Sequence, residues 1–336
     1  MSHATRRRLS AAAIALTCTA VAACGSTDKA ASPAPAPRIS TAYALPNDRA
    51  YPEGIAVDAR TGDTYVGSYT NGSVYRAAPG AARAETFLPE GTDGRTTANG
   101  LKVDRAGRLW VTDSTAGVTV YDTATRAAVA RFDVPGTAAR FVNDLAITPD
   151  GTAYLTDSAR SVVYRVTTEQ LADAVAHGGR AELTPHYDLS TVVAQHDPAA
   201  FTLNGIAADP AGRYLLTVDM NAGELYRIPL APNATDPIRK VAMHGGDLTH
   251  GDGLELHDNT LWVAQNTINT ISRWTVTEDG TAATRTSAFT DESLGLPTTL
   301  VRTNNQTLVV ASQFDKGGPM GPGTPKPFTV LAVDGI

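Results

Sequence analysis

Residues 98–113 read Ala-Asn-Gly-Leu-Lys-Val-Asp-Arg-Ala-Gly-Arg-Leu-Trp-Val-Thr-Asp, and they contain the unit from which a fold can be predicted. Asn99 and Gly100 open a short apolar run, a turn with Asp and Gly follows, and a second apolar run ends at Asp113. Short apolar runs rich in aromatic and β-branched residues, separated by Asp and Gly, predict a β-hairpin.

The same unit recurs along the chain. Its lead residues, each just before the first apolar run, are Glu53, Asn99, Asn143, Asn204, Asp252 and Thr298, spaced 46, 44, 61, 48 and 46 residues apart. Many copies continue into a third short strand. A period of about 45 residues with three or four strands is typical of a propeller blade. The sequence therefore predicts an all-β, six-bladed β-propeller.

Closure of the ring and the long third spacing each predict a further element. Residues 39–45 precede the first unit and are expected to pair with the strand around 328–333, which supplies the last blade with a fourth strand. The long spacing predicts an insertion at about 167–198, with a short helix over 168–175. Trp110, Trp262 and Trp274 lie in strand patterns, so we expect them in the core.

The N-terminal residues have the pattern of an export sequence. Arg6–Arg8 precede an uncharged run that ends at Ala23, and Cys24 follows. A basic start, a short apolar run and small residues before a cut describe a secretory signal, and Cys24 after two Ala resembles a bacterial lipobox. We expect a signal peptide at 1–23, a lipidated Cys24 with a flexible linker at 24–38, and the propeller at 39–336. The alternative is an ordinary signal of a secreted protein, in which Cys24 is incidental.

Composition limits the partners. The 336 residues include 28 Lys and Arg against 34 Asp and Glu, a formal charge of -6. Binding to nucleic-acid phosphates requires clustered Lys and Arg, so nucleic acid is not expected as the main partner. The expected localisation is the extracellular face of the cell membrane, with the N-terminal lipid as the only membrane contact.

The lead residues of all six units should meet at one place. The first strand of each blade lines the central channel, so equivalent lead residues converge at one mouth. Positions 14 or 15 residues later should return to the same face; they are Ser68, Asp113, Asp157, Asp219, Asn266 and Ser312. Carboxylate and amide oxygens without His or Cys favour a hard cation such as Ca²⁺ over zinc or copper. The alternative is that these Asn, Asp and Gly residues only form the turns that enter each strand.

These residues and the blade count resemble the senescence-marker-protein/gluconolactonase/luciferin-regenerating-enzyme family, whose wider relatives include diisopropylfluorophosphatase and paraoxonase. In that family a Glu opening the first blade, Asn residues opening middle blades and an Asp in a later Asp-Gly pair hold a divalent metal. Glu53, Asn143, Asn204 and Asp252 match these positions. The resemblance implies that Asp252 is also the catalytic acid/base or nucleophile.

Three other residues are candidates for substrate binding. The family commonly places an Arg two residues before the Asn-Asp pair, whereas Arg140 lies three residues before Asn143. Asn99 adds another amide at the mouth, and His250 lies two residues before Asp252, close enough to assist proton transfer.

The expected function is hydrolysis of a small-molecule lactone or other ester, dependent on a divalent cation such as Ca²⁺. The sequence has no Gly-x-Ser-x-Gly or P-loop motif, so triad hydrolases and nucleotide-binding folds gain no support. The competing hypothesis is a non-catalytic cell-envelope propeller that binds a ligand or protein, with any metal structural.

Overall fold

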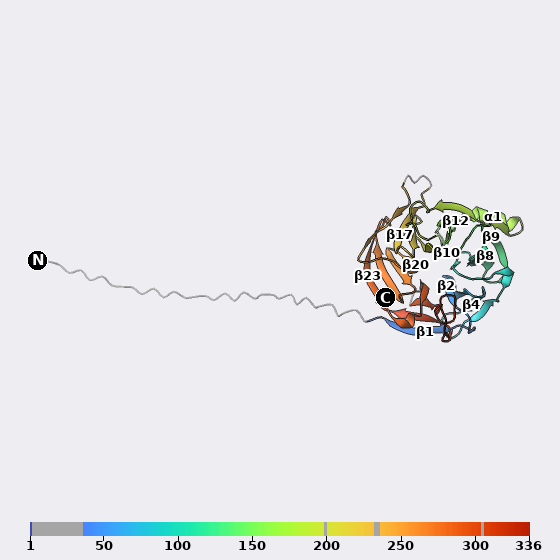
Figure 1. Ribbon diagram of the computed structural model, residues 1–336, viewed down its shortest axis with the longest axis horizontal. Coiled ribbons are helices and arrows are strands. Elements are labelled where there is room, and N and C mark those ends of the chain that lie inside the picture. The colour runs from blue at the N-terminus through green and yellow to red at the C-terminus, as the bar shows by residue number, and fades with distance from the viewer. Residues whose placement is uncertain (2–35, 198–199, 232–235, 304–305) are drawn as a thin grey trace. The chain divides into compact units, whose positions relative to one another are not determined.

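The computed structural model describes residues 1, 36–197, 200–231, 236–303 and 306–336. Strands of the part from Ala36 to Ile336 form six sheets that surround a common axis (Figure 1). The innermost strands β2, β6, β10, β15, β20 and β24 contact one another in that cyclic order, and β24 contacts β2. The predicted six-bladed β-propeller is confirmed. The expected signal peptide, Cys24 and most of the linker lie outside the described residues.

Blades 1 to 3 begin at their innermost strands. Blade 1 consists of β2 (Pro52–Val57), β3 (Thr64–Ser68), β4 (Val74–Ala77) and β5 (Glu85–Leu88). Blade 2 consists of β6 (Leu101–Val103), β7 (Arg108–Asp113), β8 (Gly117–Asp122), β9 (Ala128–Asp133) and, parallel to β9, β13 (Arg180–Glu182). Blade 3 consists of β10 (Val142–Ile147), β11 (Ala153–Asp157), β12 (Val162–Val166) and β14 (Thr184–Asp188).

Blades 4 to 6 follow the same plan. Blade 4 consists of β15 (Leu203–Ala208), β16 (Tyr214–Asp219), β17 (Glu224–Pro229) and β18 (Arg239–Lys240). Blade 5 consists of β20 (Gly251–His257), β21 (Thr260–Gln265), β22 (Thr270–Val276), β23 (Ala282–Thr290) and, parallel to β23, β19 (Ala242–His244). Blade 6 consists of β24 (Pro297–Arg302), β25 (Thr307–Ala311), β26 (Thr329–Asp334) and β1 (Arg38–Ala44).

Blade 6 closes the ring with the first strand of the domain. β1 pairs antiparallel with β26, from Arg38 opposite Asp334 to Ala44 opposite Thr329. Tyr43 on β1 is buried, and its hydroxyl lies 2.8 Å from Thr64 Oγ1 of blade 1. The expected pairing of residues 39–45 with the C-terminal strand is confirmed, and it covers an edge that would otherwise be open.

The long third spacing results from an insertion that serves two blades. It contains helix α1 (Thr168–Ala176), which confirms the expected short helix, then β13 of blade 2 and β14 of blade 3. Thr167 and Gln170 form a reciprocal capping box at the start of α1. The apolar side of α1, Leu171 and Ala174, packs into the core between blades 2 and 3. Short 3₁₀ turns, η1 (Thr92–Gly94) and η2 (Glu292–Leu294), lie in the connections before blades 2 and 6.

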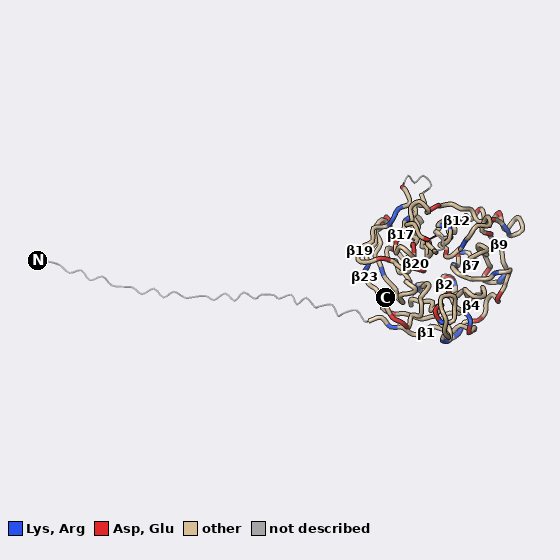
Figure 2. Tube along the Cα trace, viewed as in Figure 1, with Lys and Arg blue, Asp and Glu red and all other residues tan. Residues whose placement is uncertain are grey.

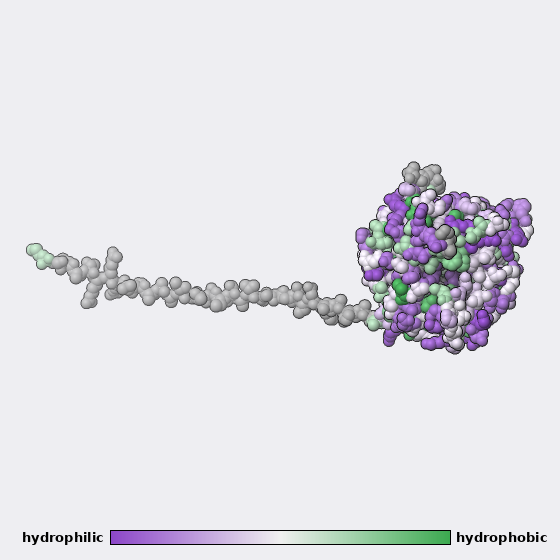
Figure 3. Space-filling model, viewed as in Figure 1, coloured by the Kyte–Doolittle hydropathy of each residue, from purple (hydrophilic) through white to green (hydrophobic). Residues whose placement is uncertain are grey.

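The core consists of apolar side chains packed between adjacent blades. Trp110, Trp262 and Trp274 are all buried, as expected. Acidic and basic residues are interspersed around the ring (Figure 2), and the face shown in Figure 3 is mostly polar with small apolar areas. Within the described part of the chain, no helix has the length and apolar character to cross a membrane.

Candidate active site

A β-bulge at the start of the innermost strands places the lead residues at the channel mouth. In blade 1, Pro52 pairs with Ser68, but the next pair is Ile55 with Val66, so Glu53 and Gly54 are left out of the ladder. The same shift occurs in β10, β15, β20 and β24. A bulge redirects side chains and frees them from the sheet pairing. This is the physical reason why the lead side chains face the channel.

Glycine at the second bulge position lets neighbouring innermost strands come close together. A Cβ atom at Gly54 would lie 1.9 Å from the Asn99 carbonyl oxygen, and one at Gly205 would lie 2.1 Å from that of Asp252. Both positions therefore exclude any side chain. Thr298 joins blade 6 to blade 1, because its hydroxyl donates to the Glu53 carbonyl at 2.7 Å.

Three acidic residues surround a small cavity on the axis. Glu53, Asp144 and Asp252 line a space of about 10 Å³ together with Asn204 and Lys102. Burial raises the pKa of Glu53 well above its usual range, and the charges of Asp252 and Asp144 raise it further. Burial also raises the pKa of Asp252 to about 8, although a hydrogen bond from Asn266 opposes that shift. The cavity has room for about one water molecule or ion.

Amide side chains hold Asp252 in place. Asn266 Nδ2 donates to Asp252 Oδ2 at 2.8 Å, and Asn204 also hydrogen-bonds to the Asp252 carboxyl. Asn204 Nδ2 lies 3.5 Å from Met220 Sδ, a weak acceptor. Asp252 is therefore buried, oriented and close to two other acids.

Two further lead amides each present an oxygen without a donor. Asn99 Nδ2 donates to Ser114 Oγ at 2.9 Å, and Asn143 Nδ2 donates to Ser158 Oγ at 3.0 Å. These bonds fix both amides, yet neither Oδ1 atom has a hydrogen-bond partner although both are buried. Most buried polar atoms in proteins have a hydrogen-bond partner. The unpaired Oδ1 atoms of Asn99 and Asn143, the lead residues of blades 2 and 3, are therefore candidates to contact a ligand.

Sequence reasoning did not select Asp144 and Lys102. Asp144 occupies the second bulge position, where four blades have Gly, and it accepts backbone N–H groups from Leu145 at 2.8 Å and Ile206 at 3.4 Å. Burial raises the pKa of Asp144, whereas the positive charge of Lys102 lowers it. Lys102 Nζ also lies 3.9 Å from Glu255. A comparison of equivalent positions in the six blades identifies Lys102 and Glu255, because the other four blades have Ala or Val there. The same comparison identifies Asp144, which stands where four blades have Gly.

Most residues of the expected second set stabilise turns. Asp113 and Asp157 accept backbone N–H groups of neighbouring loops, from Thr96 at 2.7 Å and Phe141 at 3.0 Å respectively. Asp219 accepts from two residues of its own turn and from His196 Nε2 at 2.7 Å. Asn266, through its bond to Asp252, is the member of this set that supports the acidic cluster.

The remaining substrate-binding candidates lie at the same end of the propeller. The Arg140 guanidinium donates to the Gly136 carbonyl of its own loop. His250 precedes β20 with a left-handed backbone, φ 62°, and its N–H donates to the Met220 carbonyl at 2.8 Å. Tyr51 and Leu296, the equivalent residues of blades 1 and 6, are also left-handed. Such backbone strain in residues other than glycine is concentrated at functional sites.

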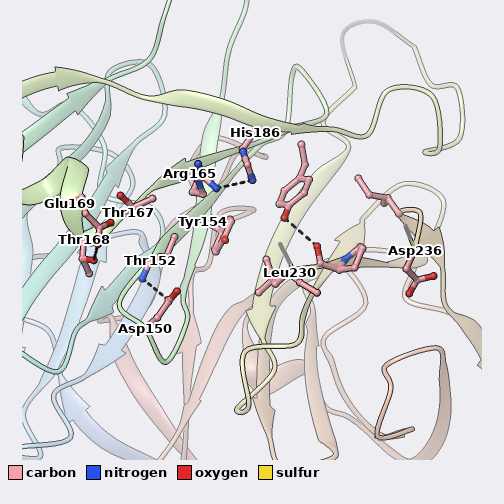
Figure 4. Close-up of a pocket in the computed structure, with 14 residues that line it drawn as sticks. Asp150, Thr152, Tyr154, Arg165, Thr167, Thr168, Glu169, His186, Leu230 and Asp236 are labelled. Carbon is pink, nitrogen blue, oxygen red and sulfur yellow. Dashed lines mark hydrogen bonds between the residues drawn. The ribbon is translucent and has the colours of Figure 1, made fainter. Parts of the chain in front are cut away.

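A wider cavity of about 770 Å³ lies at the opposite end of blades 3 and 4 (Figure 4). Its acidic groups already have partners: Asp150 accepts from Thr148 and Thr152, and Asp236 pairs with Arg227. No cluster of buried, unpaired oxygens faces it among the residues drawn. Size alone therefore does not make this cavity the better candidate site.

The axial residues could hold a hard cation. A positive ion would lower the raised pKa values of Glu53 and Asp252 and would give the oxygens of Asn99 and Asn143 a partner. In the part of the chain that the structure describes, no three His, Cys, Asp or Glu side chains are arranged to hold a metal ion by themselves. An ion at this mouth would therefore need amide oxygens as well as carboxylates, as in the predicted set Glu53, Asn143, Asn204 and Asp252.

The fold and the site together define a six-bladed β-propeller with a buried acidic cluster on its axis. No protein-family model matches the sequence, and no curated protein matches it. A gluconolactonase from Xanthomonas campestris is similar in structure, with TM-score 0.59 and 18% identity over 88% of this chain and 89% of that chain. A streptogramin B lyase has TM-score 0.55 and 14% identity over 89% of this chain and 97% of that chain.

A virginiamycin B lyase from Staphylococcus aureus is also similar, with TM-score 0.54 and 11% identity over 89% of this chain and 99% of that chain. At these identities the likeness shows a common fold. The activity must be argued from the site of this chain.

Proposed function

We propose that the channel mouth binds a divalent cation, Ca²⁺ in the first instance, and that the protein hydrolyses a lactone or another ester. One observation supports this most: buried acids with raised pKa values and buried amide oxygens without donors occur together at one mouth. The likeness to a gluconolactonase adds support at the level of the fold.

Each residue would have a distinct role. Glu53, Asn143, Asn204 and Asp252 would hold the cation, which when bound polarises the ester carbonyl. Asp252 would take the proton from the attacking water, or would itself attack the carbonyl carbon. In the first case the acyl–oxygen bond breaks, the water oxygen stays on the acyl carbon, and the proton passes to the leaving oxygen. In the second case the acyl–oxygen bond breaks as the Asp252–acyl bond forms, the leaving oxygen takes a proton from water, and hydroxide from that water then hydrolyses the acyl-Asp252 bond and frees the carboxylate. Asn266 keeps Asp252 Oδ2 in place throughout.

The test combines metal analysis with turnover. The purified protein should contain a stoichiometric divalent metal, and a panel of lactones and esters should be hydrolysed with the metal but not after chelation. Asp252→Asn should lower kcat by about 10²-fold or more. Asp173→Asn, at an exposed position on α1, is the matched control. Full turnover by metal-free protein or by Asp252→Asn would refute the proposal, and metal binding without any turnover would favour the non-catalytic propeller.

We also propose that the protein is exported and attached to the membrane through lipid on Cys24. This proposal rests on the N-terminal sequence pattern alone. Mass spectrometry of the mature N-terminus would test it, because a diacylated Cys24 and an unmodified, cleaved N-terminus differ by several hundred daltons. Cys24→Ala should release the protein from the membrane fraction; an unchanged distribution would contradict the lipid anchor.

A further inference from the structure

We propose that the substrate of this site carries a planar, apolar group, such as an aryl ring, which docks against four aromatic side chains at the channel mouth. We call Tyr69, Phe141, Phe201 and Phe314 the aromatic wall. The inference rests on the proposed function, and it narrows the substrate from any lactone or ester to one with an aryl or similar body.

The four rings form a continuous chain. The ring centroids of Phe314 and Tyr69 are 5.3 Å apart, those of Tyr69 and Phe141 are 6.4 Å apart, and those of Phe141 and Phe201 are 4.4 Å apart. These separations are within the range in which aromatic rings attract one another. Phe314 is buried in the core and supports the Tyr69 ring from behind, while Tyr69, Phe141 and Phe201 present a connected, accessible surface.

The blades from which the rings come place the wall above the channel. Phe314 follows the second strand of blade 6, Tyr69 follows that of blade 1, Phe141 precedes blade 3 and Phe201 precedes blade 4. Blade 2 separates blades 1 and 3, so Tyr69 and Phe141 can meet only by leaning inward over it. At the equivalent positions blade 2 has the small residues Ser114 and Thr97, which hydrogen-bond to each other and leave the space free.

The wall is next to the acidic cluster and open to solvent. Phe141 stands two residues before the lead residue Asn143. Phe201 stands three residues before Asn204, which lines the axial cavity with Glu53 and Asp252. Tyr69 and Phe141 are half-buried, and Phe201 is 46% exposed. The Asn221 side chain donates to the Phe201 carbonyl and so anchors the backbone beneath that ring.

Other exposed apolar side chains gather at the same end. Ile268 follows the second strand of blade 5 and is 43% exposed, and Met320, in the loop after Phe314, is 50% exposed. Met220 contacts the lead amide Asn204 through its sulfur. Exposed apolar groups concentrated around a polar site mark a binding surface rather than random exposure.

This surface fits an aryl lactone or ester better than a polyhydroxylated one. A polyhydroxylated ring would meet Phe141 and Phe201 with its C–H face, and any of its edge hydroxyls buried there without a polar partner would lose hydrogen bonds to water. A flat apolar group would instead gain ring contact on one side, with its ester carbonyl directed toward Glu53 and Asp252. Substrate choice would then be set by the aromatic wall and the reaction by the acidic cluster.

The first experiment compares two δ-lactones that share a reactive ring, one phenyl-substituted and one polyhydroxylated. The metal-loaded protein should show the higher kcat/KM for the phenyl lactone. Phe201→Ala and Phe141→Ala should each lower that kcat/KM by about three- to tenfold, mainly through KM. Phe289→Ala, a partly buried ring on the outer strand β23, is the control and should leave both substrates unaffected. Preference for the polyhydroxylated lactone would overturn the inference while leaving the hydrolase proposal intact.

The second experiment measures binding without turnover. A phenyl-substituted δ-lactam, which resists hydrolysis, is titrated against the metal-loaded protein by calorimetry. Saturable binding that weakens about three- to tenfold in Phe201→Ala, but not in Phe289→Ala, would uphold the inference even if no lactone were hydrolysed. Equal binding by wild type and Phe201→Ala, or no binding at all, would refute it.

Discussion

Raising the pH should destabilise the metal-free protein, and a divalent cation should remove this effect. Burial holds the pKa of Asp252 at about 8, and that of Glu53 well above its usual range. In the unfolded chain both acids lose their protons near pH 4. Between pH 4 and 8 the folded state therefore binds more protons than the unfolded state, so stability falls as the pH rises through this window.

The size of the effect follows from the slope of the free energy of unfolding against pH. A single group contributes at most about 1.4 kcal/mol per pH unit while it is protonated only in the folded state. From pH 5 to 7.5, Asp252 alone would then lower the free energy of unfolding by about 3 kcal/mol. For a domain of this size that corresponds to a fall in Tm of ~6 °C. A cation bound by the ionised acids takes the place of the protons, so the loss should disappear in millimolar Ca²⁺.

Differential scanning calorimetry at pH 5 and 7.5, with chelator or with Ca²⁺, measures both effects. Asp252→Asn removes one titrating group and should make the slope in chelator smaller, leaving the part that Glu53 and Asp144 contribute. Asp279→Asn is the control, because hydrogen bonds from Thr277 and Thr281 hold the pKa of Asp279 at about 2, below the window. A chelated wild type that is as stable at pH 7.5 as at pH 5 would refute the reasoning about the buried acids.

Three further predictions concern the architecture. Gly54→Ala should lower the free energy of unfolding by several kcal/mol, because the new Cβ atom would lie 1.9 Å from the Asn99 carbonyl oxygen. Gly136→Ala has open space around it and should lower that free energy by only ~1 kcal/mol, the strain of its left-handed backbone. Urea denaturation of the two variants measures the difference. A chain that begins at residue 46 lacks β1 and should aggregate, as light scattering would show, whereas one that begins at residue 36 should stay monodisperse. Lys102→Met should lower the free energy of unfolding by about 2 kcal/mol near neutral pH, because it leaves Glu255 without its positive partner. Adding Glu255→Gln should restore part of that free energy. If the double variant instead loses the sum of the two single losses, Lys102 and Glu255 do not interact.

The period of the lead residues is enough to predict the blade count, and the apolar residues at 39–45 predict the closure of the ring. These features depend on local patterns, such as Asn204 before a strand or Asp and Gly in a turn, which repeat at fixed intervals. The bulges that turn Glu53 and Asp252 toward the axis are indicated in the sequence only by the glycine that follows most lead residues. Of the predicted set, Glu53, Asn204 and Asp252 line one cavity, whereas Asn143 is not among its lining residues, and metal binding by these four residues stays a prediction.

The aromatic wall could not be predicted in the same way. Tyr69 and Phe141 contact each other across blade 2, so no repeat-based alignment of neighbouring blades pairs them. Their contact depends on the small side chains of Thr97 and Ser114, whose importance appears only when the blades surround a common axis. Residues that act between non-adjacent blades are therefore the part of such a site that sequence reasoning misses.

The glycine that follows four of the lead residues also explains how a third acid fits into the cluster. Asp144 stands where four blades have Gly, and the Cβ position of Gly100 lies only 2.6 Å from the Asp144 Cα atom and 2.7 Å from its Oδ1. Gly100 thus provides the space for Asp144. The third acid adds negative charge, which Lys102 only partly offsets because it also approaches Glu255. The folded protein must therefore retain protons on these acids or bind a cation among them, because six innermost strands bring the acids close together on one axis.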